Sequence, residues 1–156
     1  MAQNKGFSLD FNGFLDLAEE IDNKYGEEWL IYAAEQALIK TKDYVNGEIN
    51  KVVNTGGGSK WSFDKGVGYS QGKAKDSFNK VADMPVEVRG TEVTAYAGFD
   101  LAEAPEALLI AYGTPHKAAD KNIYNAIKVK GKVKKEVERI QKEVFNTVLA
   151  GGTIND

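Results

Sequence analysis

The C-terminal third of the chain shows the clearest pattern of hydrophobic and polar positions. From residue 133 to residue 148, apolar side chains recur every three or four positions, and mostly charged side chains fill the positions between them. This spacing follows the 3.6-residue turn of an α-helix, so it predicts a long amphipathic helix with one buried face. Gly131 is expected to separate this helix from a shorter apolar-periodic piece over 123–129. The predicted buried positions of the long helix are Val133, Val137, Ile140, Val144 and Val148.

Two further helices are predicted in the first third of the chain. The first begins near Asp10, a residue type favoured at helix N-caps, and ends at Gly26. The second opens at Glu27, because acidic side chains suit the positive end of a helix dipole, and it runs to about Val52. About 26 residues at roughly 1.5 Å each give a rod of roughly 39 Å. The first third therefore supplies one short and one long helix.

Strands are predicted only in the middle of the chain. Residues 86–89 and 93–99 alternate apolar and polar side chains on either side of Gly90 and Thr91, which is typical of a β-hairpin. A short helix is expected before the hairpin, over 73–81.

The apolar run 107–112 fits either a helix opened by Pro105 or a third strand, because short apolar runs do not distinguish the two. Together these elements predict a single α+β domain over residues 1–156. It has two N-terminal helices, a small antiparallel sheet with a hairpin, and a long C-terminal amphipathic helix packed on that sheet.

A glycine-rich stretch over 55–72 is predicted to be a long loop, and residues 150–156 a flexible tail. The loop holds six glycines, but it also carries Trp61, Phe63 and Tyr69. These aromatic side chains fit either a small core tucked against the sheet or a protein–protein contact. We expect residues 55–69 to be mobile in the monomer and to order against a neighbouring subunit. The glycine pattern matches neither a P-loop nor a dinucleotide-binding fingerprint.

The composition gives little support to catalysis. The 156 residues contain no cysteine and one histidine, His116, so disulfides, thiolate metal sites and cysteine nucleophiles are excluded. No catalytic, cofactor-binding or metal-binding residue is predicted, no cofactor is expected, and the chain is not expected to be an enzyme. The N-terminus lacks the apolar core of a signal peptide, and the longest apolar run is too short to cross a bilayer. We therefore expect synthesis in a cytoplasm and no membrane partner.

Five lysines fall within eight residues, at positions 128, 130, 132, 134 and 135. This run fits a solvated helix face, or electrostatic docking on an acidic partner or on DNA. The net charge of −3 argues against a dedicated nucleic-acid binder. No aromatic residue interleaves with the lysines in the sequence, so base stacking is not suggested.

Two short motifs stand in a fixed order: residues 70–78, with Gly72 and Ser77, precede the predicted hairpin, and residues 104–114, which end in Tyr112-Gly113-Thr114, follow it. In this order they resemble the tail-completion, or head–tail joining, proteins of long-tailed bacteriophages, the HK97 tail-component family. That family has an N-terminal helix pair, a TG-x-L-x-x-S element before a strand hairpin, an aromatic-Gly-Thr turn and a long C-terminal helix. Gly72 and Ser77 match the glycine and serine of the first element, and Tyr112, Gly113 and Thr114 match the turn. The resemblance covers roughly residues 9 to 149.

This chain also departs from the family pattern. Gln71 stands where the family usually has threonine, and Ala74 where it has leucine. The proline that usually follows the turn is missing from 118–122, and the stretch 55–69 looks like an insertion. These departures bear on which neck component the chain is.

The resemblance implies a structural virion protein, made in the host cytoplasm and located in the tail or neck. Such proteins form a ring, typically a hexamer, that completes the tail and joins it to the head. The implied partners are further copies of the chain, the tail tube protein and the head connector or stopper protein. Genome DNA would pass through the ring, and no sequence-specific nucleic-acid binding is implied. The expected assembly residues are Lys60, Trp61, Phe63, Tyr69, Tyr112, Gly113, Thr114 and Pro115.

Two alternatives remain at this point. One is another neck component, a stopper or an adaptor. The other is a cytoplasmic nucleic-acid-binding or regulatory module that uses the lysine run from Lys128 to Lys135. A DNA module would bind DNA with a steep dependence on salt, whereas a ring component would bind copies of itself or the tail tube.

Overall fold

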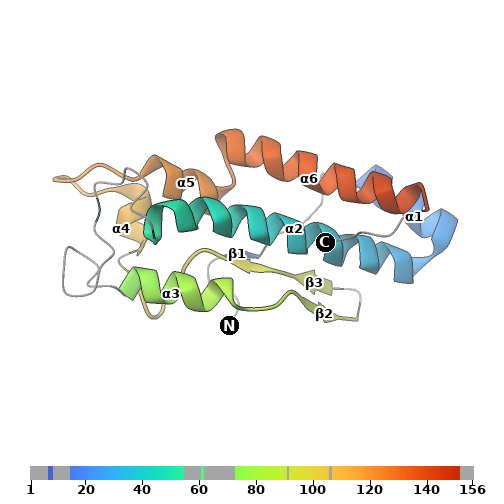
Figure 1. The fold of residues 1–156 in the computed structure, drawn as a ribbon, viewed down its shortest axis with the longest axis horizontal. Coiled ribbons are helices and arrows are strands. Elements are labelled where there is room, and N and C mark those ends of the chain that lie inside the picture. Colours follow the sequence, from blue (N-terminus) through green and yellow to red (C-terminus); the bar gives the residue numbers. More distant parts are fainter. Residues whose placement is uncertain are drawn as a thin grey trace.

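The computed structural model describes residues 7–8, 15–54, 61, 73–90, 92–105 and 107–151. A long helix, α2 (Glu27–Val53), runs through the centre of the molecule (Figure 1). Helices α5 and α6 lie along one side of it, and α3 with the strands lies along the other (Figure 1). The other helices are α1 (Leu15–Tyr25), α3 (Lys73–Ala82), α4 (Ala107–Tyr112), α5 (Lys121–Lys128) and α6 (Gly131–Leu149). The strands are β1 (Phe7–Ser8), β2 (Glu87–Arg89), β3 (Glu92–Thr94) and β4 (Tyr96–Ala97).

The predicted helices are confirmed, and the result is a mostly helical α+β fold. The first two helices meet at Gly26, whose φ of 97° is open to glycine and strained for other residues. The predicted start of the first helix at Asp10 lies outside the described residues. The ambiguous run 107–112 is a helix, and Gly131 does separate α5 from α6. Among the described residues, no helix is long and apolar enough to span a membrane.

The C-terminal helix does not pack on the sheet, so that prediction is wrong. It packs on α2 and α1, and its buried Val144, Phe145 and Val148 join Ala33 and Ala37 of α2 in one apolar cluster. The reason is size, because the described strands are two or three residues long and cannot cover a 19-residue helix. The 27-residue α2 can cover it, since its small alanines let α6 approach closely.

The buried face of α6 follows the predicted stripe with one exception. Val133, Val137, Val144 and Val148 are buried, but Ile140 is only half-buried and Gln141 is buried in its place. The amide of Gln141 donates to the hydroxyl of Thr41 over 3.3 Å, and that hydroxyl donates to the carbonyl of Ala37 over 2.7 Å. These two consecutive hydrogen bonds satisfy the two buried polar side chains, and they link α6 to the middle of α2.

The strands form two small antiparallel pairs. The predicted hairpin is confirmed, with β2 paired to β3 around a turn that contains Gly90. The chain then leaves that sheet, and β4 pairs with β1, so that Phe7 lies opposite Ala97. A strand at the N-terminus was not predicted. Because Phe7 and Ala97 are 90 positions apart, no local pattern marks their pairing.

Helix α3, confirmed at 73–82, is fixed by a buried serine. The hydroxyl of Ser77 contacts both the backbone N–H and the carbonyl of Asp100, just beyond the last strand. Phe78 and Phe99 pack beside this contact with ring centroids 6.1 Å apart. The serine that carries the family resemblance therefore has a structural role in this chain, because it joins α3 to the segment after β4.

Candidate assembly interface

The turn after α4 projects from one end of the elongated molecule (Figure 1). Its two sides are joined by a short backbone bridge, in which the N–H of Thr114 donates to the carbonyl of Lys117 over 2.8 Å and the reverse bond spans 3.3 Å. Pro115 and His116 form the exposed tip, where the N–H of His116 donates to the Thr114 hydroxyl over 3.3 Å. The side chain of His116 is exposed.

Gly113 makes this turn possible. Its N–H donates to the carbonyl of Leu109 over 2.6 Å and closes α4, and its φ is 82°. A Cβ at this position would lie 2.7 Å from the backbone nitrogen of Ala119. Both the backbone angle and the close approach of two chain segments therefore require glycine. This is the glycine of the aromatic-Gly-Thr turn on which the resemblance rests.

Trp61 holds the base of the turn from inside the molecule. Only 5% of its surface is exposed, and its indole N–H donates to the carbonyl of Ala118 over 3.0 Å. The ammonium of Lys117 lies 4.8 Å from the indole ring centroid, a cation–π contact. Trp61 belongs to the large core cluster of the chain. This burial favours the core alternative for Trp61 over an exposed protein–protein contact.

The structure brings two of the predicted groups to one end of the molecule. Trp61 lies under the turn formed by Tyr112, Gly113, Thr114 and Pro115. Tyr112 is 51% exposed and Pro115 is exposed, whereas Gly113 and Thr114 are half-buried. The remaining predicted site residues, Lys60, Phe63 and Tyr69, lie outside the described residues, as does nearly all of the 55–72 loop.

Aromatic rings do accompany the lysine run, although the sequence order hides them. Tyr112 and Tyr124 meet edge to face with ring centroids 5.5 Å apart. The ammonium of Lys128 lies 5.3 Å from the Tyr112 ring centroid, and that of Lys130 lies 5.8 Å from the Tyr124 ring centroid. A hydrogen bond with Tyr112 raises the pKa of Lys128 above its ordinary value. Tyr124 was missed as a site residue, although its place four positions before Lys128 puts the two on one helix face.

The two helices that carry these groups are joined by a tight corner. Asp120 caps α5, because its carboxylate accepts from the N–H of Ile123 over 2.9 Å. At the other end of α5, Val129 takes a left-handed conformation with φ 52° and ψ 61°. Such a backbone is unusual for a β-branched residue. The N–H of Lys130 donates to the carbonyl of Asn125 over 2.9 Å and fixes the first residue before α6.

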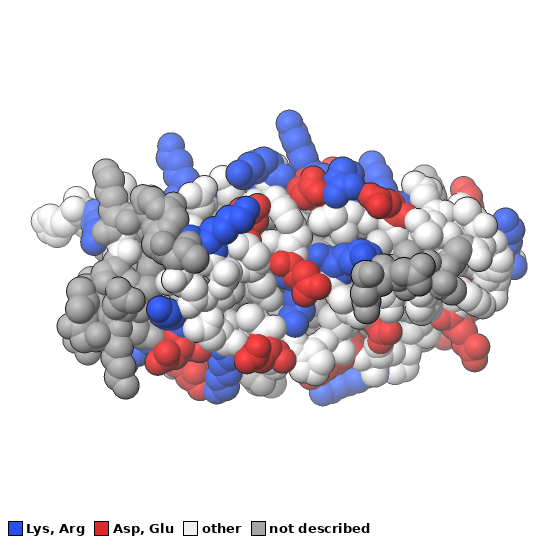
Figure 2. All heavy atoms as spheres, in the orientation of Figure 1, with Lys and Arg blue, Asp and Glu red and all other residues white. Residues whose placement is uncertain are grey.

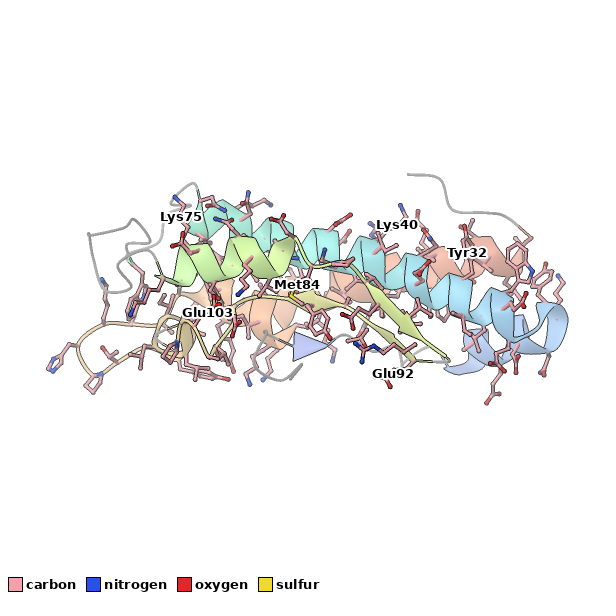
Figure 3. The ribbon with its side chains drawn as sticks, turned by 90° about the horizontal axis from the view of Figure 1, so that it is seen from below. Tyr32, Lys40, Lys75, Met84, Glu92 and Glu103 are labelled. Atoms are coloured by element: carbon pink, nitrogen blue, oxygen red, sulfur yellow. The ribbon has the colours of Figure 1, made fainter. Side chains whose placement is uncertain are left out.

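The opposite end of the molecule holds a second exposed aromatic group, which the sequence analysis did not single out. At the start of α2, Trp29 is 39% exposed and stands between Tyr25 and Tyr32, at centroid distances of 6.1 and 5.6 Å. Figure 3 shows Tyr32 toward this end and Lys75 of α3 toward the other. The three-residue spacing of Trp29 and Tyr32 within α2 was the available signal, whereas Tyr25 is the last residue of α1.

Within the described parts of the chain, no group of three or more histidine, aspartate or glutamate side chains is placed to hold a metal ion. Comparison of the chain with known proteins found no matching family model, no matching curated protein and no matching solved structure.

Proposed function

We propose that this chain is a structural virion protein of a tailed bacteriophage. In this proposal, copies of the chain form a ring at the head-proximal end of the tail, complete the tail and join it to the head connector. The partners are neighbouring copies, the tail tube protein and the connector or stopper protein. The resemblance in motif order supports this family, and the geometry of the turn after α4 is a second supporting observation.

That observation is a rigid, exposed turn at one end of an elongated molecule. Backbone hydrogen bonds at Thr114 and Lys117 fix its shape, and the buried Trp61 fixes its base. Its exposed surface includes Tyr112, and tyrosine is enriched at protein interfaces. A fixed protruding contact of this kind binds a partner without a large entropy loss, because the bound shape already exists in the free chain.

The test is to locate the protein in particles. An antibody against the chain should label purified virions at the junction of head and tail. Loss of the gene should give filled heads and unjoined tails, and the gene supplied in trans should restore joined particles. Labelling at another place on the virion, or a protein absent from particles, would contradict the proposal.

The turn itself can be tested with a matched pair of variants. Tyr112→Ala should reduce the number of joined particles, because it removes the exposed ring beside the turn. Val88→Ala is the control, since Val88 is also a large exposed apolar residue, at 41%, but lies in the hairpin. Equal losses from the two variants would mean that the turn has no special part in joining.

A second candidate is a nucleic-acid-binding module, because Tyr112 and Tyr124 lie beneath lysines of the run. Exposed rings beside cations are a feature of single-strand binding surfaces. This candidate predicts tight binding of single-stranded DNA that weakens steeply with salt. The virion proposal predicts weak binding at most.

A further inference from the structure

Opposite charges collect in two separate regions of this molecule, one from the turn after α4 to the start of α6 and the other where α1 meets α2 (Figure 1). Residues 113–135 hold seven lysines and one acidic residue, although the whole chain has a net charge of −3. Residues 16–28 hold six acidic residues and one lysine, Lys24. Six of these lysines are exposed, and five of the six, here called the lysine segment, lie close together in the sequence: Lys128, Lys130, Lys132, Lys134 and Lys135. The exposed acids of the second group, here called the acidic corner, are Glu19, Glu20, Asp22, Glu27 and Glu28.

The two groups are too far apart to neutralise each other within one copy. Figure 2 shows lysine and arginine side chains along the upper edge, over α5 and the first half of α6, with acidic side chains among them over α6. The far end of α6 lies at the acidic corner, because the hydroxyl of Tyr25 donates to the carbonyl of Leu149 over 2.8 Å. From Gly131 to Leu149 the helix rises by about 27 Å. That length exceeds two Debye lengths of roughly 10 Å at 0.1 M salt.

The lysine segment also works against the stability of its own helix. The first turn of α6 holds lysines and no acidic residue, so positive side chains stand at the positive end of the helix dipole. No lysine of the segment makes an ion pair with any residue that the structure describes. Within the single chain, Lys128 and Lys130 contact tyrosine rings, but no ion pair accounts for the other three lysines of the segment, whereas an acidic partner would.

The acidic corner carries an apolar anchor as well as charge. Trp29 follows Glu27 and Glu28 directly and leaves 39% of its surface exposed. At the other end, the exposed Tyr112 stands under Lys128. The lysine segment and the acidic corner thus each lie beside a large exposed aromatic ring, and the two surfaces carry charges of opposite sign. Tryptophan and tyrosine are enriched among the residues that dominate binding energy at interfaces.

We infer that copies of this chain associate head to tail, with the lysine segment and Tyr112 of one copy docked on the acidic corner and Trp29 of the next. Each copy uses two different surfaces in this contact, so repetition closes a ring or extends a filament. The inference rests on the proposed function only in that copies of the chain assemble. It adds which two surfaces meet.

Charge reversal of each surface tests the contact in purified full-length protein. Sedimentation velocity should show that the wild-type protein self-associates at concentrations no higher than about 1 mM. Association should weaken about tenfold or more when salt rises from about 0.1 M to about 1 M, because the Debye length falls from roughly 10 to roughly 3 Å. Lys132→Glu with Lys134→Glu, and separately Glu27→Lys with Glu28→Lys, should each weaken association about tenfold or more at the lower salt.

Mixing the two reversed proteins is the decisive measurement. An equimolar mixture should recover association to within about threefold of the wild type, because each acidified segment now meets a basic corner. Lys40→Glu with Lys73→Glu is the control, since it gives the same net charge of −7 as the reversed segment but changes lysines outside both surfaces. Trp29→Ala should weaken association about tenfold at both salt concentrations, because its contribution is apolar.

Several results would overturn the inference. They are a wild-type protein that stays monomeric at about 1 mM, a reversed variant that behaves like the control, or a mixture that fails to recover. Loss of duplex DNA binding in the segment variant, with self-association unchanged, would assign the lysines to nucleic acid instead. Failure here leaves the neck location open, because that location is measured by labelling virions and not by association in solution.

Discussion

Gly113→Ala tests whether the projecting turn is as tightly built as the structure indicates. The glycine has φ 82°, and an added methyl carbon would lie 2.7 Å from the backbone nitrogen of Ala119. Real contacts of a Cβ essentially never fall below 3.0 Å, so one of the two chain segments has to move. We expect the variant to fold less stably and to lose the defined shape of the turn.

The magnitude follows from two separate effects. A left-handed backbone costs an alanine about 1–2 kcal/mol relative to glycine. Moving the Ala119 segment disturbs its neighbours on both sides. The N–H of Asp120 donates to the carbonyl of Ile110 over 2.9 Å, and backbone hydrogen bonds join Thr114 to Lys117. Loss of one such bond adds about 0.5–1.5 kcal/mol. The expected loss in the free energy of unfolding is therefore about 1.5–3.5 kcal/mol.

Gly90→Ala is the matched control. Gly90 has φ 63° in the β2–β3 turn, but a Cβ there meets no atom within 4 Å. Gly90→Ala should lower the free energy of unfolding only by the cost of the left-handed backbone, about 1–2 kcal/mol. The effect of alanine on the unfolded chain is common to both variants. Urea denaturation followed by circular dichroism measures both. If Gly113→Ala costs no more than Gly90→Ala, the close approach to Ala119 does not constrain the turn and the argument is refuted.

Three further changes probe the core. Trp61→Ala should lower the free energy of unfolding by about 3–5 kcal/mol, since it empties a core site and leaves the Ala118 carbonyl without its donor. An unchanged melting temperature would mean that Trp61 belongs to a mobile loop and not to the core. Gly47→Ala should raise the free energy of unfolding by about 0.5–1 kcal/mol in urea denaturation, because its Cβ meets nothing within 4 Å; a loss would mean that this face of α2 is occupied. Thr41→Val should lower the free energy of unfolding by about 1–3 kcal/mol in the same measurement, because it removes the acceptor of the buried Gln141 amide. Adding Gln141→Leu to that variant should recover most of the loss, and no recovery would show that the two side chains are not coupled.

The helices could be predicted from the sequence because their signals are local. The period of α6, the glycine that ends α1 and the acidic start of α2 each lie within a few residues of the element that they define. The packing partner of α6 could not be predicted in this way, because an apolar stripe shows which face is buried and not what covers it. Gln141 illustrates the same limit. Its burial depends on Thr41, which is 100 positions away.

The candidate site was only partly predictable for a related reason. The turn at 112–115 was found through a short motif, and the structure adds what holds it. Trp61 was grouped with the loop in which it occurs, yet its indole binds Ala118 of a distant segment. The helical spacing of Tyr124 with Lys128 and of Trp29 with Tyr32 can be read from the sequence, but the exposure of Trp29 and the ring contacts of both residues cannot.

Local preferences and the fold disagree at the α5–α6 corner and at the two exposed aromatic groups, and they agree along most of the chain. Val129 takes a left-handed backbone, and lysines occupy the positive end of the α6 dipole. Tyr112 and Trp29 leave large rings exposed. In natural sequences such conflicts concentrate at functional sites, where another requirement outweighs stability. If contact between copies is that requirement, Lys132→Glu with Lys134→Glu should make the single chain more stable while it weakens association. A protein selected only for its own folding would have no reason to keep those lysines.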